Sequence, residues 1–379
     1  MSGRTFSLGR FAAVFTKEFV QMRRDRITFG MMIGVPLLQL VLFGFAINSD
    51  PKHLPAVLVM GEDSIFARSI VSTIEHTDYI RLAPAPVSEQ EADHLLKTGD
   101  VQFALTIPPH FSADLVRGRR PALVVEADAT DPVATANAVS ALNNLDRTAL
   151  QHDLTGPLAD LAPNQTPFEL RLQRRYNEEG ISQYNVVPGL IGVVLTMTMI
   201  MMTGLAMTRE RERGTMENLL AMPVLPIEVM LGKIVPFIFV GYVQVGIILL
   251  ASRFMFDVPF EGSLLTLSIA AILFIAANLA VGFTFSTFAE NQLQAMQLSV
   301  FFFLPSLLLS GFMFPFRGMP DWAQVVGQAL PLTHFLRIIR GVLLKGNGWA
   351  EIWPEIWPIA VFMLVVSALA LLRYRKTLD

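Results

Sequence analysis

The chain of 379 residues has no cysteine and little charge, because Asp, Glu, Lys and Arg make up only 16% of it. Without cysteine it forms no disulfide, thiolate zinc site, Fe–S cluster or cysteine nucleophile. A formal net charge of −3 argues against a strongly basic nucleic-acid-binding protein. The hydrophobic share of 53% excludes a disordered chain. Soluble domains carry about 25% charged residues, so an ordinary cytosolic enzyme is also disfavoured.

Apolar runs long enough to cross a membrane occur six times, since about 20 apolar residues span the hydrocarbon core as a helix. They lie at 27–47, 186–207, 234–256, 263–289, 298–316 and 356–372. The first is longer than the apolar part of a signal peptide and no cleavage site follows it, so we interpret it as a retained anchor. The last is short, and would need the membrane to thin or its flanking side chains to snorkel.

Lysine and arginine indicate the orientation, because they concentrate in cytoplasmic loops. They stand before the first run, after the second, and in the tail 373–379, which places both chain ends in the cytoplasm. The stretch 317–355 would then be external, although it is rich in bases: Arg317, Arg337, Arg340 and Lys345.

Residues 48–185, between the first two runs, alternate short strand-like and helix-like patterns. Strands are predicted at 56–60, 79–83, 101–108, 121–128 and 166–174, and helices at 63–76, 88–97 and 132–154. Ser88 and Glu91 have the spacing of a capping box. The predicted fold is therefore an α-helical integral membrane protein with six transmembrane helices and an α/β extracytoplasmic domain inserted between helices 1 and 2.

Three further segments are amphipathic. Residues 1–26 predict a helix along the cytoplasmic interface, or simply a positively charged anchor. The cytoplasmic loop 208–233 starts with alternating charges and continues as a short amphipathic helix. The external stretch 317–355 predicts two short helices around Pro331, a re-entrant hairpin. Its polar side carries His334, Arg337 and Arg340, which either snorkel or contact a headgroup or substrate at the outer exit.

The groups that power transport or catalysis are missing from the apolar runs. Their interiors contain no Asp, Glu or His, which argues against a proton antiporter. No P-loop G-x-x-x-x-G-K-[ST] occurs, and the histidines show no metal-binding spacing such as H-E-x-x-H. We therefore expect no catalytic, metal or cofactor-binding residue in this chain, and a second protein that supplies the energy.

Methionine and phenylalanine crowd the second and fifth runs, where most of them would face lipid or core. Flexible Met and flat Phe also suit a pathway for varied apolar molecules. Proline and serine in the fifth run favour a kink or close helix packing. Our candidate pathway residues are Met197, Met201, Phe302, Pro305, Ser306 and Ser310.

Five stretches carry a family resemblance: RDR with VPLLQLVLFGFAIN around the first run, YNVVPGLIGVVLTM at 184–197, ERERGTMENLLAMPVLPIEVMLGK at 210–233, LPSLLLSGFMFPFRGMP at 304–320 and LPLTHFLRIIRGVLLKG at 330–346. Together they resemble the ABC-2 type transporter permeases of bacteria, in particular inner-membrane drug and lipid exporter subunits with a large periplasmic loop. The loop motif is the most specific of them. The resemblance covers nearly the whole chain, and is weakest in the periplasmic domain.

The resemblance implies a separate nucleotide-binding ATPase subunit, which binds ATP and Mg, and two permeases per complex, either two copies or one copy and a paralogue. A periplasmic adaptor is a further open alternative, and membrane lipid is expected around the spans. The family's coupling helix, which sits in a groove of the ATPase, maps onto Arg211, Glu212, Arg213, Gly214, Thr215, Met216 and Glu217. The interface helix would flank the same ATPase with Lys17, Glu18, Arg23, Arg24 and Asp25.

The expected function is export of apolar or amphipathic molecules, drugs or lipids, across the bacterial inner membrane. Two alternatives come from other classes. One is a non-transporting membrane partner of an ATPase that relays conformational change to envelope proteins, although such proteins usually have four spans. The other is a membrane enzyme acting on lipid, which the lack of a buried acid–base constellation disfavours.

Overall fold

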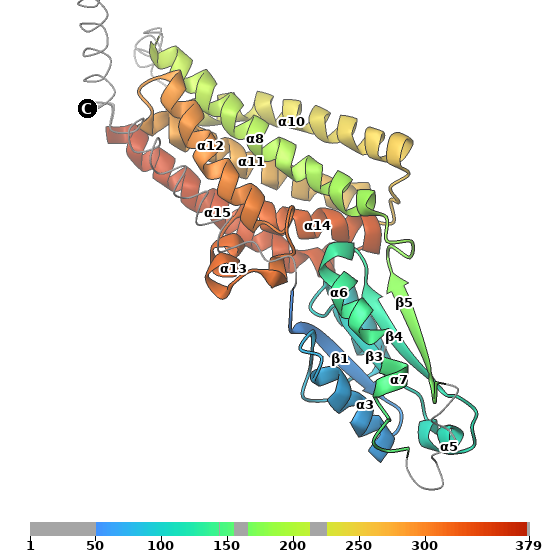
Figure 1. Ribbon diagram of the computed structural model, residues 1–379. Helices are drawn as coiled ribbons and strands as arrows, with labels where there is room; N and C mark the ends of the chain where they lie inside the picture. Colours follow the sequence, from blue (N-terminus) through green and yellow to red (C-terminus); the bar gives the residue numbers. More distant parts are fainter. Residues whose placement is uncertain (1–50, 144, 155–165, 213–225, 377–379) are drawn as a thin grey trace, which may run out of the picture.

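The computed structural model describes residues 51–143, 145–154, 166–212 and 226–376. The predicted interface helix at 1–26 with its five named residues, the span at 27–47, and residues 213–217 of the coupling set lie outside this part of the chain. The described residues form a sheet domain and a bundle of long helices (Figure 1).

The sheet domain holds one mixed sheet in the order β2-β1-β3-β4-β5. Strands β3 and β4 pair antiparallel, while the other neighbouring strands pair parallel. The five strands are β1 (Leu54–Met60), β2 (Ile80–Leu82), β3 (Phe103–Ile107), β4 (Ala122–Asp128) and β5 (Glu169–Arg175). All five coincide with predicted strands, because short β-branched and apolar runs bounded by polar residues define them locally.

Helices cover the two faces of this sheet unequally. On one face, a core that includes Phe103, Phe111 and Leu142 joins the strands to α3 (Ile65–Glu75), α5 (Phe111–Val116), α6 (Pro132–Leu142) and α7 (Leu145–Thr148). On the other face, α4 (Glu89–Thr98) packs Leu96 against β1 and β3. Ser88 caps α4 by accepting a hydrogen bond from the Glu91 amide at 3.2 Å, as predicted.

The long helix predicted at 132–154 is in fact interrupted. Helix α6 ends at Leu142, with Asn143 as its C-cap, and the short α7 follows it. Asparagine disfavours helix interiors because its side chain competes for backbone hydrogen bonds, which a periodicity of apolar residues does not reveal.

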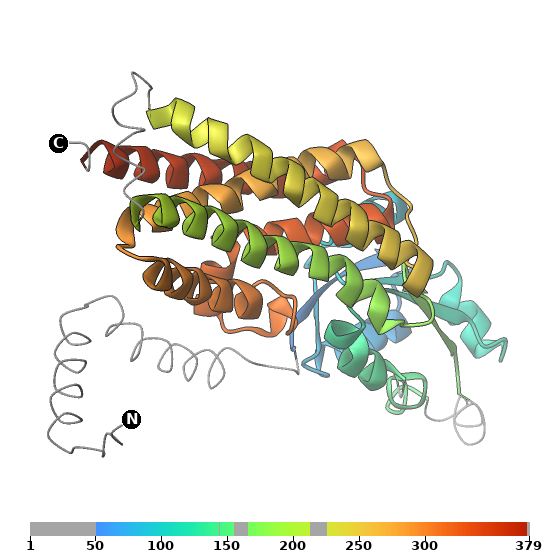
Figure 2. The ribbon, with the colours of Figure 1, turned by 90° about the horizontal axis from the view of Figure 1, so that it is seen from above.

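Five described helices are long and apolar enough to cross a membrane. They are α8 (Ser182–Glu212), α10 (Pro226–Phe256), α11 (Leu264–Phe288), α12 (Gln292–Leu309) and α15 (Trp349–Lys376). They run alongside one another, with α11 packed against α8, α10, α12 and α15 (Figure 2). Gly282 of α11 permits a close approach to α8, since a Cβ there would lie 2.4 Å from the Ile200 carbonyl oxygen.

Of the five described long helices, only α11 lies within one residue of its predicted bounds at both ends. Helices α8 and α10 extend beyond the predicted spans, and α12 and α15 differ from them in ways that the local sequence explains. Helix α12 starts at Gln292, where the Asn291 side chain caps it, and ends before the left-handed Gly311, not at residue 316. Helix α15 starts at Trp349, seven residues before the predicted span at 356–372, so the helix is longer than its apolar run. Glu351, Glu355 and two prolines interrupt the apolar run, but they lie within the first turns of one continuous helix.

The predicted pair of short helices in 317–355 is present as α13 (Asp321–Gln328) and α14 (Pro331–Lys345), after a short 3-10 helix η3 (Phe316–Gly318). Helix α14 is buried along most of its length and packs on α8, α11 and α15. Its Phe335 ring stacks on that of Phe274 at 4.1 Å. Helix α14 therefore lies between the long helices and the sheet domain (Figure 1).

Candidate functional site

A cavity of about 320 Å³ lies where the sheet domain meets the helical bundle. We call it the junction cavity. The sheet domain contributes the end of α4, the end of β4 and the start of α6, and the bundle contributes residues around Gly311, η3, α13, α14 and the start of α15. Most of its lining side chains are polar or charged, and the basic ones come largely from η3 and α14.

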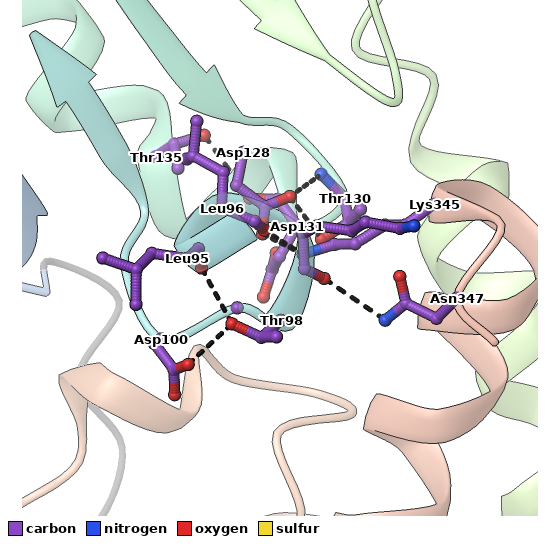
Figure 3. Close-up of polar contacts among 12 residues, drawn as sticks. Leu95, Leu96, Thr98, Asp100, Asp128, Thr130, Asp131, Thr135, Lys345 and Asn347 are labelled. Carbon is purple, nitrogen blue, oxygen red and sulfur yellow. Dashed lines mark hydrogen bonds and ion pairs between the residues drawn. The ribbon is translucent and has the colours of Figure 1, made fainter. Parts of the chain in front are cut away.

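A buried ion pair joins the two halves of this junction (Figure 3). Strand β4 ends at Asp128, whose Oδ2 lies 2.5 Å from Nζ of Lys345 at the end of α14, with both side chains at most 7% exposed. Asp128 Oδ1 also accepts hydrogen bonds from the Thr130 amide and hydroxyl. Lys345 donates a second bond to the Leu96 carbonyl oxygen at 3.0 Å and lies over the Tyr176 ring. Both charges are therefore compensated although they are buried.

Arg340 ties helix α8 to the same junction. It donates to Asn185 Oδ1 of α8 at 2.7 Å and to the Gly311 carbonyl oxygen after α12 at 3.2 Å. Asn185 in turn donates to the Thr130 carbonyl oxygen of the sheet domain at 3.0 Å. One arginine thus links α14, the beginning of α8 and the turn that follows α12.

Two more contacts fix the sheet domain on the bundle. Arg317 of η3 donates to the carbonyl oxygens of Gly99 and Asp100, at 2.9 and 3.1 Å. Gly99 is the left-handed C-cap of α4, so its carbonyl group points away from that helix. Asn347 donates to the Lys97 carbonyl oxygen at 3.2 Å. The end of α4 is therefore held by residues on either side of α13 and α14.

His334 and Arg337 both contact Glu355 of α15. His334 Nδ1 lies 2.5 Å from a Glu355 carboxylate oxygen, and its Nε2 lies 2.7 Å from the Gln328 carbonyl oxygen. Arg337 Nη1 lies 3.1 Å from the other carboxylate oxygen. The polar side of α14 thus makes contacts within the protein, and a role for His334, Arg337 and Arg340 at a substrate exit stays a prediction.

Burial perturbs the carboxyl group of Asp131, which caps the start of α6 and lines the junction cavity. Loss of hydration raises the pKa of Asp131, while the nearby Arg340 charge acts in the opposite direction. Burial likewise raises the pKa of Tyr176 to about 12. Among the described residues no group of His, Asp and Glu is arranged to hold a metal ion.

The predicted pathway residues do not all meet in one place. Met197 is exposed on α8, Met201 is partly buried there, and Pro305 lies within α12. The Phe302 ring packs near Phe285 and Phe362. Ser306 and Ser310 bond to carbonyl groups of their own helix, and of the six only Ser310 lines the junction cavity. Their role in a pathway stays a prediction.

At the far end of α8, Glu212 joins this helix to α12. Its carboxylate accepts hydrogen bonds from the Gln292 backbone amide, at 2.7 Å, and from the Gln292 side chain. Of the seven predicted coupling residues, the described part contains Arg211 and Glu212, the last two residues of α8.

The sequence analysis missed Asp128, Asp131, Asn185 and Glu355 as site residues. One signal pointed to the junction: the external stretch 317–355 is unusually rich in bases for its predicted side of the membrane. The structure accounts for this excess, because the bases of η3 and α14 bind carbonyl and carboxylate oxygens inside the protein.

Comparison with known proteins matches residues 26–372 to the model of a family described as ABC-2 family transporter protein. The "Probable multidrug ABC transporter permease YbhS" of Escherichia coli is 30% identical, over 97% of this chain and 96% of that protein. The "Inner membrane transport permease YhhJ" of the same organism is 29% identical, over 90% and 93%. The "Linearmycin resistance permease protein LnrN" of Bacillus subtilis is 22% identical, over 90% and 93%. No solved structure matches the chain.

Proposed function

This chain belongs to the ABC-2 family of transporter proteins, and we propose that it exports apolar or amphipathic molecules, drugs or lipids, across a bacterial inner membrane. It is a multi-pass membrane protein and a permease subunit, so ATP is hydrolysed by a partner subunit. ATP and Mg would bind to that partner. A second permease, as a copy or a paralogue, would complete the complex, and a periplasmic adaptor remains an open alternative.

The observation that carries this proposal is the connection of α8 at both of its ends. With 31 residues at 1.5 Å each, α8 is about 46 Å long. Glu212 bonds to α12 at one end, and Asn185 bonds to Arg340 and the sheet domain at the other. A displacement at the cytoplasmic end of a rigid helix would therefore reach α12 and the external domain together.

In the proposed cycle, ATP draws two ATPase subunits together, and these push the coupling residues 211–217 of each permease. Alternating charges there would make charge-assisted contacts with the ATPase. Helix α8 would then move with α12, and a path beside these helices would open outward. The names of two relatives, which mention multidrug transport and linearmycin resistance, support an amphipathic cargo.

Reconstitution of the permease with its ATPase in vesicles tests this function. Outward movement of a fluorescent dye or labelled lipid, dependent on both ATP and the ATPase, is the expected result. ATP turnover without movement of any tested compound would instead favour the alternative function, a membrane partner that relays conformational change to envelope proteins.

A charge reversal tests the coupling site separately. Glu212→Lys together with Glu217→Lys should weaken copurification with the ATPase and leave membrane insertion intact. The matched control is Glu178→Lys with Glu179→Lys, which changes the same charge on two exposed residues just before α8. Equal ATPase binding by both double variants would rule out the coupling assignment.

A further inference from the structure

Several residues that line the junction cavity have a buried polar atom without a partner. Among the described residues, six buried side-chain atoms lack a hydrogen-bond partner, and three of them belong to residues that line this cavity: Gln102 Oε1, Arg340 Nε and Asn347 Oδ1. A buried polar atom without a partner is costly, so three such atoms around one cavity favour a polar molecule bound there. The cavity has room for one, since 320 Å³ is about ten times the volume of a water molecule.

Some of the basic side chains around the cavity are paired with a carboxylate and others are not. Lys345 and Arg337 each pair with a carboxylate, Asp128 and Glu355 respectively. Arg317 and Arg340 instead donate to backbone carbonyl and amide oxygens, which carry no net charge. Neither guanidinium group has a carboxylate at ion-pair distance among the described residues, although Asp131 and Asp128 attract Arg340, and Asp100 and Asp128 attract Arg317, over longer distances. A bound anion would compensate the positive charge that remains.

Two other carboxyl groups line the cavity and bear on its charge. Asp131 lies near Arg340, but burial favours its neutral form. Asp100 is exposed and accepts a hydrogen bond from the Thr98 hydroxyl at 2.6 Å. Because neither forms an ion pair with Arg317 or Arg340, the guanidinium groups remain available to a ligand.

Tryptophan positions place the cavity at the level of lipid headgroups. All four tryptophans of the chain are exposed, and they lie on α13 and in the first turns of α15: Trp322, Trp349, Trp353 and Trp357. Exposed tryptophan is typical of the membrane–water interface. The same two helices line the cavity with Gln324, Gln328 and Glu355.

We propose that the junction cavity binds a phosphate ester that carries a hydroxyl group, with Arg317 and Arg340 contacting the phosphate. Guanidinium groups match phosphate oxygens in charge and geometry. Gln102 Oε1 and Asn347 Oδ1 would accept the hydroxyl protons, which satisfies the two unpartnered acceptors. A glycerophosphate headgroup has both features. This site goes beyond the proposed export function, since it requires neither ATP nor a particular cargo.

Binding to the purified full-length protein in a neutral maltoside detergent tests the site without any transport step. The probes are dihexanoyl phosphatidylglycerol and free glycerol 3-phosphate, and dihexanoyl phosphatidylcholine is the control lipid because its headgroup has no hydroxyl. Calorimetric titration gives the Kd of each. We expect saturable binding of phosphatidylglycerol and a Kd at least tenfold weaker for phosphatidylcholine.

Two arginine variants locate the binding. Arg340→Gln removes the inner guanidinium but also the contacts to Asn185 and Gly311, so it could misfold. Arg317→Gln therefore carries the test, because Arg317 is exposed and loses only its two bonds to the carbonyl oxygens of Gly99 and Asp100. An unchanged thermal midpoint of this variant shows that the junction stays assembled. Arg317→Gln should weaken phosphatidylglycerol binding at least tenfold. Arg68→Gln, at a surface ion pair with Asp63 in the sheet domain, should change the Kd less than twofold.

Each outcome decides the proposal. Binding of both phosphatidylglycerol and glycerol 3-phosphate would support the site and show that the headgroup alone suffices. Binding of phosphatidylglycerol alone would support the site and identify the ligand as a membrane lipid. The proposal is overturned if neither probe saturates, if Arg317→Gln binds as tightly as the unmodified protein, or if phosphatidylcholine binds equally well. Failure of export in vesicles would leave these results unaffected.

Discussion

Replacing Lys345 by methionine should loosen the sheet domain from the helical bundle. Methionine keeps the length of the side chain but removes the ammonium group, which leaves the Asp128 carboxylate only 7% exposed and without its counterion. Removing one partner of a buried pair costs about 3–5 kcal/mol. Asp128 would retain the hydrogen bonds from Thr130, so we expect a cost near the lower end, about 3 kcal/mol.

Hydrogen exchange of the full-length protein in detergent measures this change. If the free energy needed to open the junction falls by about 3 kcal/mol, amides that exchange through this opening should exchange about a hundredfold faster. The acceleration should appear in α4, the end of β4 and the end of α14. Helix α3 lies in the core on the other sheet face and serves as the internal control.

A double-mutant cycle separates the ion pair from side-chain packing. Asp128→Asn leaves Lys345 with the Leu96 carbonyl oxygen and the Tyr176 ring. The combination Lys345→Met and Asp128→Asn should cost less than the sum of the single changes, because neither charge is then left unpaired. Two results together would refute the assignment of this pair as the main contact of the junction. They are an exchange rate that rises less than tenfold for Lys345→Met, and effects of the two substitutions that simply add in the double variant.

Two further predictions concern local packing and charge. Asp131→Asn should raise the thermal midpoint at pH 8, because it removes a buried carboxyl group with a raised pKa and keeps a good N-cap. The gain in thermal midpoint should shrink as the pH falls toward 3.8, the ordinary pKa of an aspartate, because the buried carboxyl group is then protonated. A difference that does not change with pH would contradict this reasoning. Gly282→Ala should destabilise the bundle by about 1–3 kcal/mol, since its Cβ would meet Ile200 at 2.4 Å. Gly246→Ala on α10, with open space around it, is the control and should be neutral or slightly stabilising in the same thermal unfolding assay.

The local elements of this protein follow from short stretches of sequence. Strand β4 and helix α4 lie within one or two residues of their predicted bounds, because a polar–apolar alternation and a capping serine act over a few neighbours. The apolar spans are recognised by length alone, but their ends are not. Helix α15 includes Glu355, a charged residue that a span predicted from apolar residues leaves out. The structure explains its place in the helix, because His334 and Arg337 pair with it.

The sequence by itself determined that this chain crosses a membrane several times, carries an α/β domain and lacks a motor of its own, since these properties depend on composition and local pattern. Only the tertiary structure decided which charges meet. Lys345 and Asp128 are 217 residues apart, and Arg340 and Asn185 are 155 apart. Periodicity carries no information over such separations, because the partners become neighbours only when the sheet domain packs on the helices. Three of the four bases that contradicted the expected orientation signal therefore help to hold the two parts together: Arg317 and Lys345 directly, and Arg340 through Asn185.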